Sequence, residues 1–185
     1  MDFEALAADP VTVGTLVGAL ALVLFAAAWH KIAQRDAFAG ALAAYRLLPA
    51  PAVPAFALLL PAVELLLGLG VLVPATRTPA LIALAALLLA YAAAIGINLA
   101  RGRRDIDCGC GGESQALSWA LVQRNVVLAA AALIASGPVL QRRMDWVDAL
   151  TLVLGVLCFY ALYLMADELM RQATRLARPV PGQET

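Results

Sequence analysis

Long apolar runs alternate with short polar segments along the chain, which is typical of a helical membrane protein. Leu and Ala dominate these runs, and both residues favour helix. Each run is long enough to cross a hydrocarbon layer about 30 Å thick, or close to it. The five runs cover about residues 11–29, 52–73, 79–100, 116–136 and 146–166. We therefore predict an all-α fold, a polytopic bundle of about five transmembrane helices.

The segment 31–48 follows a different pattern, because apolar and charged residues mix within it. Its apolar residues recur at roughly helical spacing: Ile32, Phe38, Leu42 and Tyr45. This spacing predicts a short amphipathic helix that lies at the membrane interface after the first span. A group of prolines that begins at Pro49 ends this helix, since proline cannot continue a helix interior.

Composition fixes the broad class. The chain of 185 residues is 63% hydrophobic and 14% charged, with a mean hydropathy of +0.86. A soluble domain carries far more charge, and the β-branched and aromatic enrichment of barrel strands is missing. The net charge of zero gives no electrostatic basis for nucleic-acid binding. We expect one membrane domain over residues 1–185, with a cysteine loop at 101–115 and a flexible tail at 172–185.

The distribution of Lys and Arg predicts how the bundle is oriented. The loops 30–51 and 101–115 and the C-terminal tail together hold nine, whereas the N-terminus and the other two loops hold three. Loops rich in Lys and Arg stay in the cytoplasm. The count therefore predicts a periplasmic N-terminus, a cytoplasmic C-terminus and a cysteine loop on the cytoplasmic side.

The residues with the most reactive chemistry lie in the cysteine loop. Cys108 and Cys110 flank Gly109, and two further glycines follow them. Sulfurs two positions apart bond only where the chain folds tightly, because the two Cα atoms must come within about 7 Å. Such a local disulfide is strained, and strained, exposed disulfides are reduced easily. We therefore predict that Cys108 and Cys110 form a redox pair that is oxidised transiently.

Other interpretations of the cysteines stay open. The alternative is that the loop is a glycine-rich turn with two unreactive thiols. Two thiols are too few for a closed zinc site, His30 is the one histidine, and Cys158 is predicted within the bilayer, so no metal is expected. Cys158 itself fits ordinary helix packing better than a third redox centre.

Charges within the apolar runs are the second informative feature. An unpaired charge near the middle of a span costs at least about 2.5 kcal/mol on insertion scales, so a partner or a polar cavity is expected. Our hypothesis is that Glu64 and Arg124 face each other, or a shared cavity beneath the cysteine loop. Gln123 and Asn125 would add polar lining to it. A purely structural ion pair is the alternative. In the first run, Gly14 and Gly18 form a Gly-x-x-x-Gly pattern, which can mark close helix packing but is also frequent by chance.

Several segments together resemble the methylamine utilisation protein MauE family, within the wider MauE/DoxX-like redox-associated membrane proteins. The cysteine loop followed by Arg-Asn in the next helix is the most specific of them. The segments are Lys31 with the F-x(3)-L-x(2)-YRLLP run (38–49), LLPAVELLLGLGVL (59–72), CGCGG (108–112) and ALVQRNVVLAAAAL (120–133).

The resemblance implies a bacterial inner-membrane protein that acts in the maturation of periplasmic methylamine dehydrogenase. The small subunit of that enzyme is rich in disulfides and carries a tryptophan tryptophylquinone. The implied partner is MauD, a thioredoxin-like protein. Cys108 and Cys110 would then exchange disulfides with it, although a non-catalytic membrane scaffold or export factor is the alternative. No motif identifies a cofactor, and the binding of a quinone stays open. A transporter is a poorer match, because the spans show no internal repeat.

The implied periplasmic role conflicts with the predicted cytoplasmic position of the cysteines, because disulfides persist in the periplasm. Three resolutions exist. The loop folds back into the bundle and exchanges electrons across it, or the charge count misleads because some arginines pack onto the bundle, or the cysteines never meet the substrate. We prefer the first, since polar groups of the fourth span offer the loop a place to enter.

Overall fold

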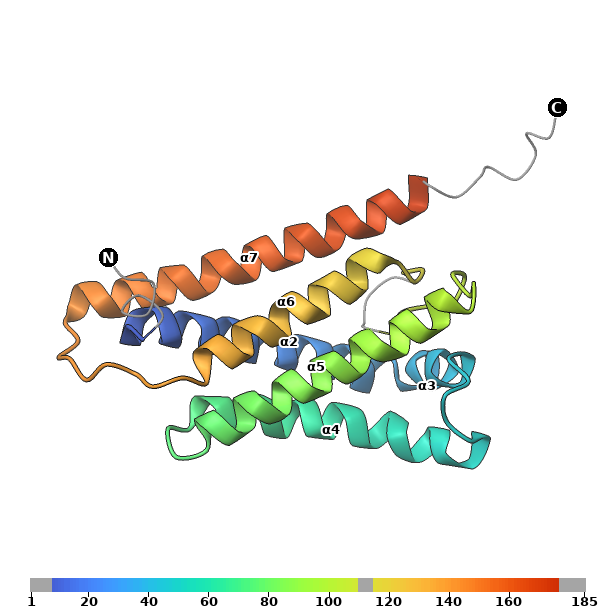
Figure 1. Cartoon of the computed structure of the whole chain (residues 1–185), viewed down its shortest axis with the longest axis horizontal. Helices are drawn as coiled ribbons and strands as arrows, with labels where there is room; N and C mark the ends of the chain where they lie inside the picture. Colours follow the sequence, from blue (N-terminus) through green and yellow to red (C-terminus); the bar gives the residue numbers. More distant parts are fainter. Residues whose placement is uncertain (1–7, 110–114, 177–185) are drawn as a thin grey trace.

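The computed structural model describes residues 8–109 and 115–176. Over these ranges the chain forms α-helices, one short 3₁₀ helix and no strand, which confirms the all-α prediction (Figure 1). The elements are α2 (Pro10–Ala33), α3 (Arg35–Ala44), η1 (Ala50–Ala52), α4 (Val53–Leu72), α5 (Arg77–Ala100), α6 (Trp119–Ala135) and α7 (Trp146–Leu176).

Within the described residues, four helical segments are long and apolar enough to cross a membrane: α2, η1 with α4, α5 and α7. The fifth apolar helix, α6, has 17 residues and a length of about 25 Å, just short of the hydrocarbon thickness. All five run along the long axis of the molecule (Figure 1). The chain is thus a multi-pass helical bundle, as predicted.

The first and last spans extend beyond their predicted ranges. Asp9 caps α2 by accepting a hydrogen bond from the Val11 amide at 2.8 Å, and Pro10 occupies the first turn. The same helix continues past the predicted end to Ala33. At the other end of the chain α7 continues to Leu176, so residues 172–176 are helical. The rest of the predicted tail lies outside the described residues.

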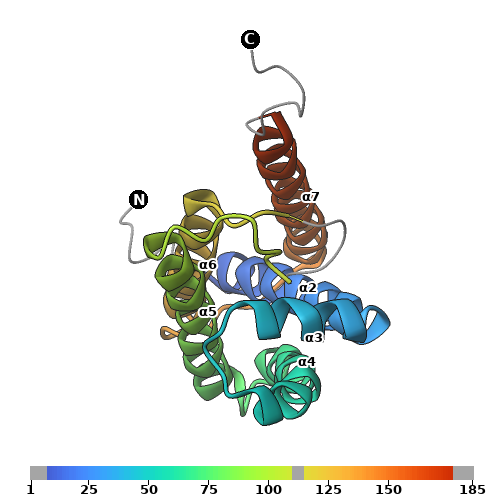
Figure 2. The same ribbon diagram turned by 90° about the vertical axis from the view of Figure 1, so that its right-hand side faces the viewer.

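The predicted amphipathic segment is divided between two helices. Lys31 and Ile32 belong to α2, and α3 begins after a break at Gln34. The buried face of α3 carries Phe38 and Ala41, which point to the bundle, while most of its other residues are at least partly exposed. The helix therefore covers one end of the bundle, beside α4 (Figure 2).

The two ends of the bundle hold different loops. The amide of Leu140 donates to the carbonyl of Ala8 at 2.8 Å, and Arg142 contacts Asp9 at 3.0 Å, so the start of α2 and the 136–145 segment share one end. The loop after α5, helix α3 and the C-terminal end of α7 lie at the opposite end (Figure 1). This is the alternation that five successive spans require.

The main core lies between α2, α5 and α6, where large and small side chains interlock. One buried cluster contains Leu20 and Leu24 of α2, Leu81 and Leu84 of α5, and Ala132 of α6. Helix α7 stands apart from this core and packs mainly on α2 (Figure 2). Many of its large apolar side chains are more than half exposed, as expected of a surface that meets lipid.

The Gly-x-x-x-Gly pattern of the first span makes the contact between α2 and α7. A Cβ atom at Gly14 would lie 2.6 Å from Cδ1 of Leu152, and one at Gly18 would lie 2.6 Å from Cγ2 of Val156. From the other side, a Cβ at Gly155 would lie 3.0 Å from Thr15. Small residues on both helices therefore permit close approach of the backbones.

We predict that Gly18→Ala destabilises the protein more than Gly14→Ala. Val156 is β-branched and has one favoured rotamer in a helix, so it cannot turn away from the new methyl group, whereas the end of Leu152 can. The cost at Gly18 should be about 1–3 kcal/mol, measured by unfolding of the detergent-solubilised protein. Gly96→Ala on α5 is the control, because nothing lies within 4 Å of its Cβ position. A Gly18 variant as stable as the Gly96 variant would contradict this packing.

Candidate functional site

The cysteine loop is a tight hairpin in its described part. The amide of Cys108 donates to the carbonyl of Gln115 at 2.8 Å, and Asp107 pairs with Ala116 in an isolated antiparallel bridge. Gly109 has a φ of +68°, a conformation that other residues adopt at a cost, and its amide donates to the carboxylate of Asp107 at 3.0 Å. Glycine is therefore required at the position between the two cysteines.

This hairpin is folded into the end of the bundle. Cys108 is only 8% exposed and packs in an apolar cluster with Tyr45, Ile95 and Leu121. The hydroxyl of Tyr45 donates to the Cys108 carbonyl at 3.2 Å, and a Cβ at Gly109 would lie 3.2 Å from that of Ala41. Burial, followed by the nearby Asp107 carboxylate, raises the pKa of Tyr45, so its hydroxyl remains a donor at neutral pH.

Arg103 fixes the near end of the loop to two helices. Its guanidinium donates to the Asn98 side chain at 3.0 Å and to the carbonyls of Ala44 and Tyr45 at 2.7 and 3.3 Å. These bonds satisfy carbonyls at the C-terminal end of α3 that have no partner within the helix. One of the arginines counted for orientation is therefore packed onto the bundle.

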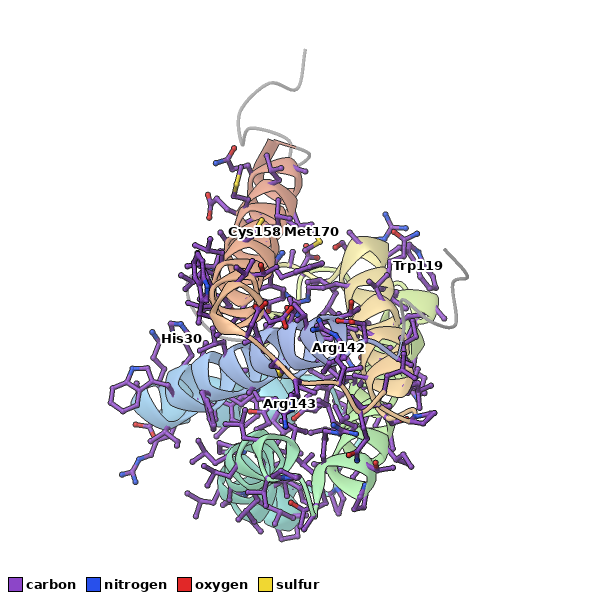
Figure 3. All side chains as sticks on the ribbon, turned by 90° about the vertical axis from the view of Figure 1, so that its left-hand side faces the viewer. His30, Trp119, Arg142, Arg143, Cys158 and Met170 are labelled. Carbon is purple, nitrogen blue, oxygen red and sulfur yellow. The ribbon has the colours of Figure 1, made fainter. Side chains whose placement is uncertain are left out.

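The structure describes two of the three cysteines, and these two differ in bonding and exposure. Cys108 is disulfide-bonded, and Cys110 lies outside the described residues. Cys158 is a free thiol on α7, labelled in Figure 3, and it is exposed. The expectation that Cys158 packs between helices is therefore wrong, because α7 turns this residue away from α2. Among the described residues no three His, Cys, Asp or Glu side chains gather as a metal site would require.

Glu64 and Arg124 do not face each other, contrary to one form of the sequence-based hypothesis. Lys31 Nζ lies 2.6 and 2.9 Å from the two carboxylate oxygens of Glu64, and Tyr91 donates to one of them at 2.9 Å. Lys31 is 5% exposed and Glu64 1%. Helix α4 packs on α2, α3 and α5, whereas α6 packs on α5 and α2, so Lys31 is the nearer cation.

Lys31 is the candidate site residue that the sequence pattern does not identify. The sequence pattern predicts Lys31 in the interfacial segment 31–48 as a loop charge, whereas α2 continues to Ala33 and Lys31 is buried. A signal was present in the sequence, since a carboxylate within an apolar run requires a cation and Lys31 directly follows the preceding apolar run.

Arg124 has its own partner at the far end of α7. Its guanidinium lies 2.5 Å from the Asp167 carboxylate, which also pairs with Arg171. Asn125 is buried and donates to the carbonyl of Leu121 in its own helix at 2.8 Å, while Gln123 is exposed. Arg124 therefore connects α6 to α7, and none of these three residues lines the cavity beside the cysteine loop.

A cavity of about 300 Å³ lies beside the cysteine hairpin, among α3, α4 and α5. Cys108 and Gly109 form part of its wall, and so does Lys31. Apart from these groups the lining is aliphatic and aromatic. Glu64 and Arg124 are not part of it, but Lys31 brings the end of the Glu64 ion pair to its surface. The structure thus places the cysteine loop and a buried charge pair at one site.

Comparison with known proteins shows which family the chain resembles. The model of the family described as methylamine utilisation protein MauE matches residues 10–137. A protein named methylamine utilization protein MauE from Paracoccus denitrificans is 46% identical over 132 residues, which are 70% of this chain and 71% of that protein. One of the same name from Methylorubrum extorquens is 42% identical over 130 residues, 69% and 70% of the two chains. No solved structure matches significantly.

We predict that Lys31→Met and Glu64→Leu each destabilise the protein by about 3–5 kcal/mol, because each leaves one buried charge without its partner. The double variant should recover most of that loss, since no unpaired charge remains. Unfolding of all four proteins in detergent measures the coupling. Additive losses in the double variant would show that the two charges do not depend on each other.

Proposed function

Because the chain belongs to the methylamine utilisation protein MauE family, we propose that it assists the maturation of periplasmic methylamine dehydrogenase by thiol–disulfide exchange through Cys108 and Cys110. The observation that supports this most is the position of Cys108, in a glycine-dependent hairpin at the wall of a cavity in a membrane bundle. The role of the protein in the methylamine utilisation system follows from its family. The reaction and its residues are our proposal.

The proposed exchange takes two steps. A thiolate of a thioredoxin-like partner, MauD in this proposal, attacks one sulfur of the Cys108–Cys110 disulfide and forms a mixed disulfide. The second thiolate of the partner then displaces the chain's sulfur. The partner leaves with a disulfide for the enzyme's small subunit, and the two cysteines of the chain remain as thiols. The Tyr45 and Gln115 bonds to Cys108 hold its backbone throughout.

A non-catalytic scaffold or export factor for the same system is the second candidate. The feature that favours it is α7, whose outer face exposes large apolar side chains along most of its length, including Leu154, Leu157 and Leu162. Such a face also fits a transmembrane helix of another protein. In that case the cysteines would have only a structural role.

For the orientation we propose an inner-membrane protein with a periplasmic N-terminus and a cytoplasmic C-terminus. The charge count supports it, although Lys31, Arg103 and Arg171 of the richer side are all bonded within the bundle. Even without these three, the richer side keeps six of its nine cations against three. The inward fold of the hairpin supports our preferred resolution, in which Cys108 exchanges electrons through the bundle.

We predict that Cys108→Ser, Cys110→Ser and the double variant lose assembly of active methylamine dehydrogenase, because exchange requires both sulfurs. Enzyme activity and the disulfides of the small subunit, measured in a strain that lacks the native gene, test this. Cys158→Ser is the matched control and should retain assembly, since its thiol is free and on the outer face of α7. Full assembly with the double variant would favour the scaffold.

The orientation predicts which introduced cysteines react from outside the cell. In a cysteine-free background, Ala75→Cys should react with an impermeant maleimide on intact cells, and Asp36→Cys should react only after the cells are opened. Both positions are exposed, and they lie at opposite ends of the bundle. The reverse labelling pattern would invert the topology.

A further inference from the structure

The proposed exchange leaves Cys108 and Cys110 reduced after each turn, so the protein needs an oxidant that returns them to the disulfide. Cys108 is only 8% exposed and forms part of the wall of an apolar cavity. An oxidant that reaches the sulfur from this side must dissolve in lipid. The cavity is not sealed, because Leu47, one of its lining residues, is 39% exposed.

The lining of the cavity combines apolar walls with one cationic donor. Its walls include Phe56, Leu60 and Ile95, which suit a hydrocarbon ring or tail. Lys31 is the charged side chain of the lining, and its ammonium lies 5.6 Å from the ring centre of Phe38 and 5.5 Å from that of Tyr91. A flat, apolar molecule with a hydrogen-bond acceptor on its ring matches this combination.

The hydrogen bonds of Lys31 leave room for such an acceptor. An ammonium group has three donors, and the bonds within the described residues go to the two oxygens of Glu64. Tyr91 donates to Glu64 as well, so it holds the carboxylate in place. A fatty acyl chain makes no hydrogen bond to this buried charge pair. The pair is costly to maintain in a bilayer, so binding of an acyl chain does not explain it.

A second, smaller cavity gives Lys31 access to polar groups. Its volume is about 40 Å³, which is enough for a water molecule. It shares Lys31, Phe38 and Gly109 with the larger cavity, and it is also lined by His30 and Asp107 at the loop end of the bundle. Lys31 therefore borders a second, more polar space at that end in addition to the apolar cavity.

We infer that the larger cavity binds a lipid-soluble quinone, with a ring carbonyl hydrogen-bonded to Lys31 and the ring beside Cys108. Binding stands on the cavity alone, while the redox step rests on the proposed function. In that step the Cys108 and Cys110 thiols lose two electrons and two protons and form their S–S bond. The quinone gains two electrons and two protons and leaves as quinol. The Lys31 ammonium donates a proton to the reduced carbonyl and is reprotonated through the smaller cavity.

Binding is tested first, with the full chain in nanodiscs and decylubiquinone as the probe in calorimetric titration. Ala94 lines the cavity, so Ala94→Trp should weaken binding by at least about tenfold. Ala93→Trp on the same helix is the matched control, because Ala93 is exposed and outside the lining, and it should bind within about twofold of the native protein. The Lys31→Met/Glu64→Leu variant, which keeps the charge balance, should lose affinity as Ala94→Trp does.

The redox step is tested with the reduced protein under anaerobic conditions. One oxidised quinone should be consumed for every two thiols lost, with equal formation of quinol, and Cys108→Ser/Cys110→Ser should bind quinone but not reduce it. Failure of the native protein to bind quinone, or equal binding by the Ala93 and Ala94 variants, overturns the inference. A lipid acyl chain found in the cavity by native mass spectrometry, which added quinone does not displace, also overturns it. Quinone binding with no thiol oxidation instead retains the binding site and refutes the redox step between the thiols and the quinone.

Discussion

The Lys31–Glu64 ion pair is the interaction on which the arrangement of the site depends. It joins α2 to α4 inside an apolar bundle, and neither charge is tolerable there without the other. Tyr91 extends the contact to α5. Three helices are thus fixed relative to one another at the level where α3 and the cysteine hairpin close the end of the bundle. An exposed surface pair would contribute little, but in a pair that is 5% and 2% exposed in its side chains the loss of one partner leaves an uncompensated buried charge.

The hairpin depends on this frame because it has little structure of its own. Its described part makes one isolated bridge and a few backbone bonds, and its position comes from contacts with Tyr45, Ile95 and Leu121 of the bundle. Gly109 permits both the turn and the close approach to α3. The bundle thus determines which surface of Cys108 is accessible and which molecules reach its sulfur.

The helices were predictable from sequence, whereas the partners of the buried charges were not. Apolar runs of about 20 residues have one stable solution in lipid, and the runs around α4 and α5 agree with the helices to within two residues. Pairing of Glu64 depends on which helices are neighbours, and no local pattern encodes that. Lys31 was overlooked because apolar length alone ended the span before it. Arg124 pairs with Asp167, which lies beyond the apolar run that predicts the last span, because α7 continues past the end of that run.

The attachment of α7 has a consequence for the order in which the protein is made. Every residue that lines the larger cavity lies between Lys31 and Gly109, so the ribosome has completed the chamber before it translates the final helix. Arg124, in contrast, enters the bilayer more than forty residues ahead of the carboxylate that neutralises it. The arrival of Asp167 therefore converts a costly intermediate into the finished bundle. The Arg124–Asp167 ion pair thus favours packing of α7 onto the preceding helices over its separation from them in the lipid after release from the translocon.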